Sequence, residues 1–112
     1  MGDYGERIAV SYLEKLGYFV LERNFVSKSG EIDIIAKYKE EYVFVEVKCR
    51  KSCLYGYASE SVNLNKKKHI LKCSEYFIYK NNLNYKPIRF DVIEIYVRRG
   101  NIVINHIKNA FF

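Results

Sequence analysis

Two charged side chains interrupt the most apolar run of the chain, and this run limits the possible folds more than any other stretch. The segment Tyr42–Lys48 reads YVFVEVK. Its β-branched and aromatic residues are typical of a strand that is covered on both faces. Because side chains alternate along a strand, Glu46 and Lys48 share a face with Phe44. Burying an unpaired charge is expensive, so these two residues require an ion pair, a metal ion or a cleft open to water.

A second strand is predicted directly before this one, over Glu31–Tyr38. The short polar link Lys39–Glu41 predicts that the two strands pair as an antiparallel hairpin. Neighbouring strands lie about 4.8 Å apart, so Asp33 and Glu46 at facing positions can hold one cation between them. Their oxygen atoms suit Mg²⁺ or Mn²⁺. The alternative is a structural ion pair of Lys48 with Glu46 or with Asp33.

The rest of the chain predicts two helices and three further strands. The predicted helices are Asp3–Leu16 and a second one that begins at Asn63 or Asn65 and ends near Lys80. The predicted strands are Tyr18–Phe25, Ile88–Val97 and Ile102–Ile107, and Cys49–Glu60 is predicted to be a loop. This order indicates an α/β fold with a mixed five-stranded sheet flanked by two helices, in a single domain spanning residues 1–112.

The charge of the chain favours a polyanionic partner. The 112 residues carry a formal net charge of +6, and nucleic acid is the commonest partner of such a basic protein. The alternative is that the charge only keeps a small protein in solution. No apolar run approaches the roughly 20 residues that a membrane span needs, and the N-terminus has no signal-peptide pattern. We therefore expect no membrane association and a cytoplasmic location.

The carboxylates and the lysine of the predicted hairpin also form a known motif. Asp33, followed after twelve residues by Glu46-x-Lys48, resembles the PD-(D/E)xK signature of restriction-endonuclease-like and Holliday-junction-resolvase-like nucleases. The wider pattern includes Gly5-Glu6, Leu16-Gly17-Tyr18, Arg23-Asn24, Gly30-Glu31-Ile32-Asp33, Arg89-Phe90-Asp91-Val92 and His106-Ile107-x-Asn109-Ala110-Phe111. Read in order, these motifs resemble the YraN-like family of small bacterial predicted endonucleases over essentially the whole chain. The chain lacks the proline of the full signature and has Ile32 in its place, and this proline is often absent in these folds.

The resemblance implies a metal-dependent endonuclease that hydrolyses phosphodiester bonds of DNA, with branched or junction DNA among its candidate substrates. Asp33 and Glu46 would bind Mg²⁺ or Mn²⁺, and Lys48 would orient the attacking water or stabilise charge on the phosphate. Glu6 would complete the metal site. The residues themselves allow a second interpretation of Glu6, as the partner of an Asp3 N-cap in a capping box.

Several charged residues around this motif have supporting roles in the prediction. The residues expected to hold the nucleic-acid backbone are Arg50, Lys51, Lys66 and Lys67. Lys66 and Lys67 fall in the first turn of the second helix, where the helix dipole disfavours cations, so phosphate contacts are one explanation and a solvated face is the alternative for Lys67. Glu31 shares a face with Asp33 and is expected to support the site. Asp91 could be a third carboxylate at the site, but it is expected to pair with Arg89 or with the backbone of a turn rather than to act as a ligand.

Two other functions remain open on the same sequence. One is a nucleic-acid-binding module without catalysis, and the other is a protein-interaction domain that uses the surface of its 11 tyrosines. The chain is too small to surround a branched junction alone, which makes a symmetric homodimer a reasonable expectation.

Overall fold

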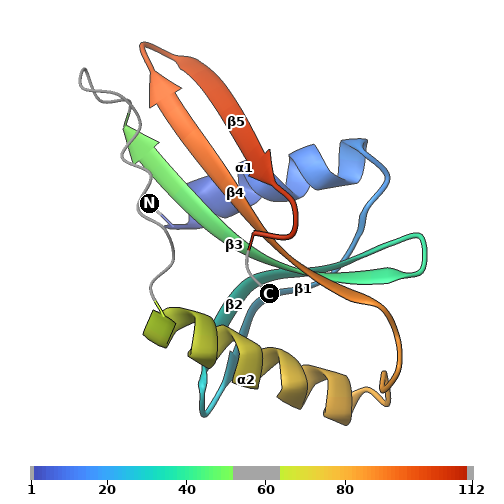
Figure 1. The fold of residues 1–112 in the computed structure, drawn as a ribbon. Helices are drawn as coiled ribbons and strands as arrows, with labels where there is room; N and C mark the ends of the chain where they lie inside the picture. The colour runs from blue at the N-terminus through green and yellow to red at the C-terminus, as the bar shows by residue number, and fades with distance from the viewer. Residues whose placement is uncertain (1, 52–63, 111–112) are drawn as a thin grey trace.

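A computed structural model describes residues 2–51 and 64–110, which form one mixed sheet and two helices (Figure 1). In chain order the elements are α1 (Gly2–Lys15), β1 (Phe19–Ser27), β2 (Gly30–Tyr38), β3 (Glu41–Lys51), α2 (Leu64–Lys80), β4 (Ile88–Arg98) and β5 (Asn101–Ile107). The strands follow the order β1-β2-β3-β4-β5, and β3 and β4 are parallel whereas the other neighbours are antiparallel. The predicted α/β fold with a mixed five-stranded sheet and two helices is confirmed.

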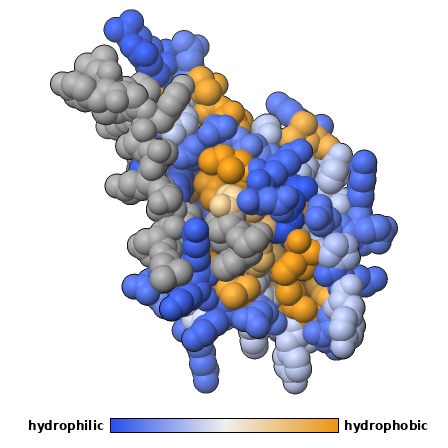
Figure 2. All heavy atoms as spheres, viewed as in Figure 1, coloured by the Kyte–Doolittle hydropathy of each residue, from blue (hydrophilic) through white to orange (hydrophobic). Residues whose placement is uncertain are grey.

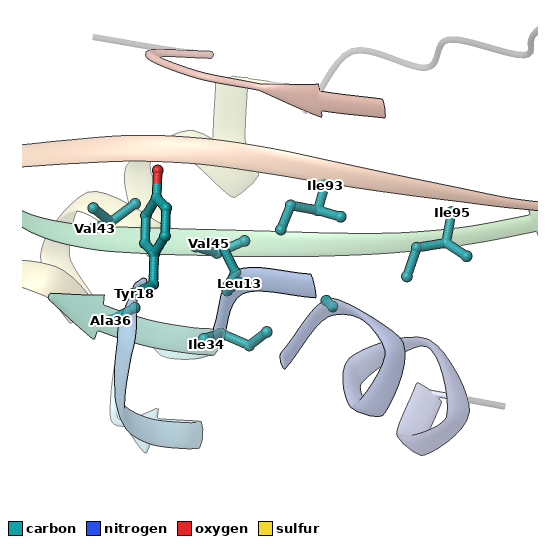
Figure 3. Close-up of a cluster of buried hydrophobic side chains, with 9 residues drawn as sticks. Leu13, Tyr18, Ile34, Ala36, Val43, Val45, Ile93 and Ile95 are labelled. Carbon is teal, nitrogen blue, oxygen red and sulfur yellow. The ribbon is translucent and has the colours of Figure 1, made fainter. Parts of the chain in front are cut away.

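The two helices cover opposite faces of the sheet, so each central strand is buried on both sides. The core under α2 contains Ile32, Ile35, Phe44, Ile70, Cys73, Phe77, Phe90 and Val92. The core under α1 contains Ala9, Leu13, Tyr18, Ile34, Ala36, Val43, Val45, Ile93 and Ile95 (Figure 3). On β3, Val43 and Val45 therefore face α1 while Phe44 faces α2, as strand alternation requires.

The strands β2 and β3 pair along only part of their length. Their register runs from Tyr38 opposite Glu41 to Ile34 opposite Val45. Beyond this point β2 continues along β1, and β3 continues along β4, so the two strands diverge at the centre of the molecule (Figure 1). We call this divergence the fork. Asp33 and Glu46 are the first residues beyond the last pair, one on each side of the fork.

Some predicted boundaries differ from the structure because tertiary pairing extends the elements. The strand β3 runs on to Lys51, since β4 supplies a parallel partner at every position up to Val97. Arg50 and Lys51 therefore lie in this strand rather than in a loop, which corrects the prediction. Residues 52–60 of the predicted loop lie outside the described residues. The helix α1 already includes Gly2, so Asp3 lies within the helix rather than at its N-cap.

The surface on the side shown in Figure 2 is largely hydrophilic, with separate hydrophobic areas between the polar side chains. Several exposed apolar side chains lie on the edge strands, including Phe19 and Val26 on β1 and Ile102 and Val103 on β5. Within residues 2–51 and 64–110, no helix has the length and apolar character needed to cross a membrane.

A substitution at Gly5 tests how closely α1 packs on β3. A Cβ atom at Gly5 would lie 3.0 Å from the Cβ of Cys49. We expect Gly5→Leu to lower the free energy of unfolding by about 1–3 kcal/mol, because this contact leaves no room for a side chain, although leucine favours a helix more than glycine does. Chemical denaturation measures the change. In the matched variant Ser11→Leu, at an exposed position of α1, we expect a change within about 0.5 kcal/mol. Equal stability of the two variants would contradict the close packing.

Candidate functional site

A cleft of about 420 Å³ lies between the fork and the first turns of α2. Its lining residues are Gly30, Glu31, Asp33, Glu46, Asn65, Lys66, His69 and Ile70. The structure thus brings together Glu31, Asp33, Glu46 and Lys66, which the sequence predicts as site residues. Asn65 and His69 also line the cleft, and the sequence analysis does not identify them as site residues.

Gly30 allows α2 to approach the strands closely enough to form one wall of this cleft. Its φ angle of +150° is a conformation that favours glycine. A Cβ atom at Gly30 would lie only 3.3 Å from the Cβ of His69. The close approach of α2 to the start of β2 therefore depends on the missing side chain.

Asp33 bridges the two sides of the fork through a hydrogen bond. The backbone N–H of Val47 donates to Asp33 Oδ2 at 2.8 Å, which connects the two strands beyond their last paired residues. Burial and the charge of Glu46 nevertheless raise the pKa of Asp33 to about 7, and the charge of Glu6 adds to this effect. The Val47 hydrogen bond and the charge of Lys66 oppose the rise without cancelling it. The folded protein therefore disfavours the ionised form of Asp33.

Glu46 is compensated by a lysine from α2. Lys66 Nζ lies 2.5 Å from Glu46 Oε1, and the Glu46 side chain is only 8% exposed. This ion pair was not predicted, because the sequence analysis considered Lys48 as the partner of Glu46. It joins β3 to the first turn of α2 across the cleft.

Lys48 lies two residues after Glu46, on the same face of β3. Burial and the positive charges of Arg50 and Lys66 lower its pKa, while Glu46 and Glu94 act in the opposite direction. Glu94 stands opposite Lys48 in the register of β3 and β4. The cationic groups of Lys48, Arg50 and Lys66 are therefore close enough to affect one another electrostatically.

Glu94 is a further acidic residue near this site. It is buried, and it accepts a hydrogen bond of 2.8 Å from Asn105 Nδ2. Glu94 is not among the predicted site residues, although the sequence offers the same signal as for Glu46, a carboxylate within the apolar run IRFDVIEIYV. Because it faces Lys48, Glu94 helps to set the charge balance of that lysine.

Glu6 contributes to the site from α1. It is buried, and its Oε1 has no hydrogen-bond partner among the described residues. Arg23 Nη2 approaches this atom only to 3.9 Å. The charge of Glu6 raises the pKa of Asp33, so the two carboxylates affect each other through space. Because α1 already includes Asp3, the structure does not place Asp3 at the N-cap that a capping box with Glu6 requires. The role of Glu6 as a metal ligand stays a prediction.

The predicted nucleic-acid-binding residues are spread unevenly around the cleft. Lys66 lines it, and Arg50 lies on the face of β3 that carries Glu46 and Lys48. Lys67 is partly buried on α2 and is not among the lining residues. Lys51 occupies the last position of β3, opposite Val97.

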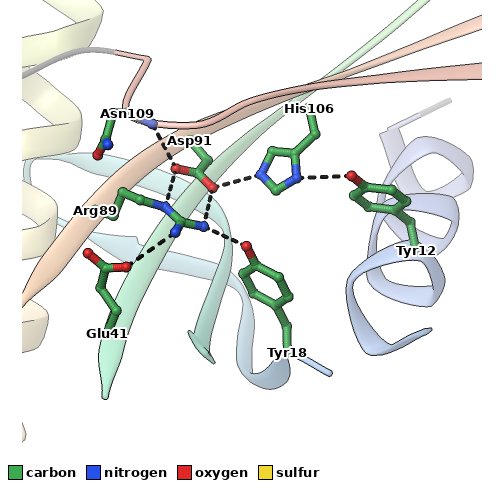
Figure 4. Close-up of polar contacts among 7 residues, drawn as sticks. All are labelled: Tyr12, Tyr18, Glu41, Arg89, Asp91, His106 and Asn109. Carbon is green, nitrogen blue, oxygen red and sulfur yellow. Dashed lines mark hydrogen bonds and ion pairs between the residues drawn. The ribbon is translucent and has the colours of Figure 1, made fainter. Parts of the chain in front are cut away.

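Asp91 lies outside the cleft, in a buried polar network on the α1 face of the sheet (Figure 4). Arg89 donates to it through Nε at 2.9 Å and Nη2 at 2.8 Å, which confirms the predicted Arg89–Asp91 pair. Nε2 of His106 lies 2.7 Å from the same carboxylate, and the N–H of Asn109 donates to it at 3.1 Å. Burial alone would raise the pKa of Asp91, but the hydrogen bonds from His106 and Arg89 outweigh it and lower the pKa.

The donor atoms of the cleft are chemically suited to a hard divalent cation. Within the described part of the chain, no three His, Cys, Asp or Glu side chains converge as a ready-made metal site. Mg²⁺, however, is commonly held by one or two carboxylates, with water and substrate phosphate as the remaining ligands. Asp33 and Glu46 supply two carboxylates, and Glu6 supplies a buried oxygen without a hydrogen-bond partner in the described chain. The residues present therefore fit such an ion.

Fold and site together define a small α/β protein with an acidic cleft where two strands of its sheet diverge. The model of the family described as "Uncharacterised protein family UPF0102" matches residues 5–95. A UPF0102 protein of Clostridioides difficile (strain 630) is 54% identical over 110 residues, which cover 98% of this chain and 95% of that protein. A UPF0102 protein of Caldicellulosiruptor bescii is 51% identical over 114 residues, which cover 99% and 96% of the two chains. The chain belongs to the UPF0102 family, which is the YraN family that its motifs resemble.

Replacing Asp33 by the neutral residue asparagine tests whether the folded protein disfavours the ionised carboxylate. We expect Asp33→Asn to raise the free energy of unfolding by on the order of 1–3 kcal/mol at pH 8 without metal. The folded protein disfavours ionised Asp33, because its pKa is about 7 rather than 3.8. This penalty is absent below about pH 4, grows as the pH rises towards 7 and is complete above it. Chemical denaturation in EDTA at pH 4.5 and pH 8 measures the difference.

The exposed residue Glu31 provides the control for this experiment, because it also lines the cleft. We expect Glu31→Gln to change stability by less than about 0.5 kcal/mol at either pH. A wild-type protein that is more stable than Asp33→Asn at pH 8 would show that the cleft already neutralises its carboxylates.

Breaking the Asp91 network should destabilise the protein, and the effect should depend on pH in the opposite sense to that of Asp33→Asn. The Asp91 side chain is 0% exposed. We expect Asp91→Asn to lower the free energy of unfolding by about 3 kcal/mol at pH 7, because Arg89 loses its buried counter-charge. Since the folded pKa is lowered, the stability contributed by Asp91 is present above about pH 4 and is lost as the pH falls through the folded pKa. The difference in the free energy of unfolding between the wild type and Asp91→Asn, measured by chemical denaturation, should therefore be smaller at pH 3 than at pH 7. A gap that stays constant from pH 7 to pH 3 would rule out this account, and the exposed variant Glu40→Gln serves as the control.

Proposed function

We propose that this protein is a divalent-metal-dependent endonuclease that hydrolyses phosphodiester bonds of DNA. The observation that carries the proposal is the position of Asp33 and Glu46 on opposite sides of the fork, facing one cleft. Lys48 follows on the same strand face as Glu46 and completes the Asp…Glu-x-Lys set in space. The names of the UPF0102 relatives state no activity, so the proposal depends on this geometry and on the motif.

Asp33 and Glu46 are the residues that would hold Mg²⁺ or Mn²⁺, with Glu6 beside them. When bound, the ion would supply positive charge that polarises the scissile phosphate and lowers the pKa of a water molecule. The hydrogen bond from Val47 fixes one oxygen of Asp33 before any ligand arrives. This orientation reduces the reorganisation that binding requires.

Lys48 is suited to act on the phosphate or on the attacking water. Its lowered pKa makes the ammonium a better proton donor, and in its charged form it would stabilise charge that develops on the phosphate. Its position two residues after Glu46 places it on the face of β3 that carries the metal-binding carboxylate. Substrate and metal would thus be contacted from the same strand.

The basic residues of the site support binding of a nucleic-acid backbone. Arg50 follows Lys48 on the same strand face, and Lys66 contributes from the wall that α2 forms. Asn65 and His69 add polar groups to that wall. Contacts of this kind hold phosphates without reading sequence. They suit a substrate that is selected by its shape, and a homodimer would double the surface available for it.

A nucleic-acid-binding module without catalysis is the second candidate function. The ion pair between Lys66 and Glu46 favours it, because this lysine already neutralises one of the two carboxylates. The two candidates differ in their dependence on metal, since only the endonuclease needs a divalent ion to act.

The decisive test is cleavage of labelled nucleic acids with Mg²⁺ or Mn²⁺. The panel holds DNA as a four-way junction, a flap, a single strand and a duplex, together with a structured RNA. We expect metal-dependent cleavage that falls by about 100-fold or more in Asp33→Ala and in Lys48→Ala, because each removes a group that acts on the transition state. Glu40→Gln, in the turn at the far end of the hairpin, is the control and should keep full activity.

Cleavage that persists without metal or in both variants would contradict the proposed mechanism. Salt-sensitive binding without cleavage, unchanged in both variants, would identify the binding module instead. If the protein neither binds nor cleaves any substrate, a nucleic-acid function is wrong altogether.

A further inference from the structure

The ion pair between Lys66 and Glu46 occupies the position where the proposed function requires a metal ion. Lys66 Nζ lies 2.5 Å from Glu46 Oε1. The Lys66 side chain is 50% exposed, whereas that of Glu46 is 8% exposed. The ammonium group therefore reaches from the open side of the cleft down to a nearly buried carboxylate.

The place of Lys66 in α2 makes this ion pair informative. The helix begins at Leu64 and has no acidic residue in its first turn, where the dipole disfavours positive charge. Lys67 and Lys68 follow directly, so three cations stand at the unfavourable end of the helix. The helix dipole gives a cation at this position no support, whereas Glu46 on β3 supplies a favourable partner from outside the helix.

Lys66 also acts on the second carboxylate of the cleft. Its charge opposes the effect of Glu46 on Asp33, so one ammonium interacts favourably with both acidic residues. A divalent cation held by Asp33 and Glu46 would do the same with twice the charge. The ammonium and the cation therefore compete for the same place.

We propose that Lys66 is an internal counter-ion of the cleft, which holds Glu46 in the metal-free protein and leaves it when a divalent cation binds. The inference rests on the proposed metal site and adds an exchange step to it. The released ammonium stays attached to α2 at the wall of the cleft, where it can donate hydrogen bonds to a substrate phosphate. Metal affinity is thus set in part by a residue that is not a ligand.

Binding of Mn²⁺ to wild-type protein, Lys66→Met and Lys68→Met tests the exchange directly, with free Mn²⁺ followed by electron paramagnetic resonance at one neutral pH and an ionic strength of about 0.15 M. Methionine keeps an unbranched side chain but removes the charge. We expect Lys66→Met to bind Mn²⁺ about tenfold or more tightly than the wild type, because the competing charge is gone. Lys68→Met should remain within about twofold of the wild type, because Lys68 is exposed and does not line the cleft.

Thermal unfolding with EDTA and with Mn²⁺ gives a second, independent measurement. Without metal, Lys66→Met should unfold several degrees below the wild type, because the carboxylates lose their counter-charge. Adding Glu46→Gln to this variant should remove most of that loss, as expected for two residues that interact directly. Mn²⁺ should raise the unfolding temperature of Lys66→Met more than that of the wild type.

The outcomes separate this inference from the proposed function. If the wild type binds Mn²⁺ and Lys66→Met binds it equally or more weakly, the exchange is wrong while the metal site stands. Mn²⁺ binding by Lys66→Met but not by the wild type would support the exchange strongly. If none of the proteins binds Mn²⁺, the metal site itself fails, and the exchange fails with it.

Discussion

The hydrogen bond from the Val47 N–H to Asp33 joins two strands at the point where they stop pairing, and the cleft depends on it. On one side of the fork, β2 follows β1 beneath α2, and on the other side β3 follows β4 beneath α1. Without the fork, Asp33 and Glu46 would be neighbours in a closed sheet. With it, both carboxylates face one cleft, where burial and the charge of Glu46 raise the pKa of Asp33.

The opposite face of the sheet shows how the protein buries charge when no ligand is needed. Asp91 is fully buried, and Arg89, His106 and the backbone of Asn109 all bond to it. Tyr18 also accepts a hydrogen bond of 2.6 Å from Arg89, which ties this group to the core under α1. The contrast with Asp33 is physical: Asp91 has several hydrogen-bond donors, whereas Asp33 has one backbone donor within the described part of the chain, is partly buried and has acidic neighbours.

The sequence predicts those features that depend on local pattern. Alternation along Tyr42–Lys48 reveals that Glu46 and Lys48 share a face, and the short link before it predicts the hairpin that carries Asp33. Pattern could not predict where this hairpin opens, because the fork depends on the pairing of β3 with β4. The same holds for the Lys66–Glu46 ion pair, which joins a helix to a strand through the packing of α2. Arg50 and Lys51 were assigned to a loop for this reason too, since only β4 extends the strand to them.

The parallel pairing of β3 with β4 also governs how the chain assembles. The strands β1, β2 and β3 form from neighbouring segments, whereas β4 can join β3 only after the chain has passed through α2. Contacts between distant segments form late, because they require the closure of a long loop. Along the chain, Glu6, Asp33 and Glu46 therefore precede the lysine that pairs with Glu46. Docking of α2 then buries Ile70 and Phe77 and at the same time brings the ammonium of Lys66 to Glu46, so this late step of folding is sensitive to ionic strength.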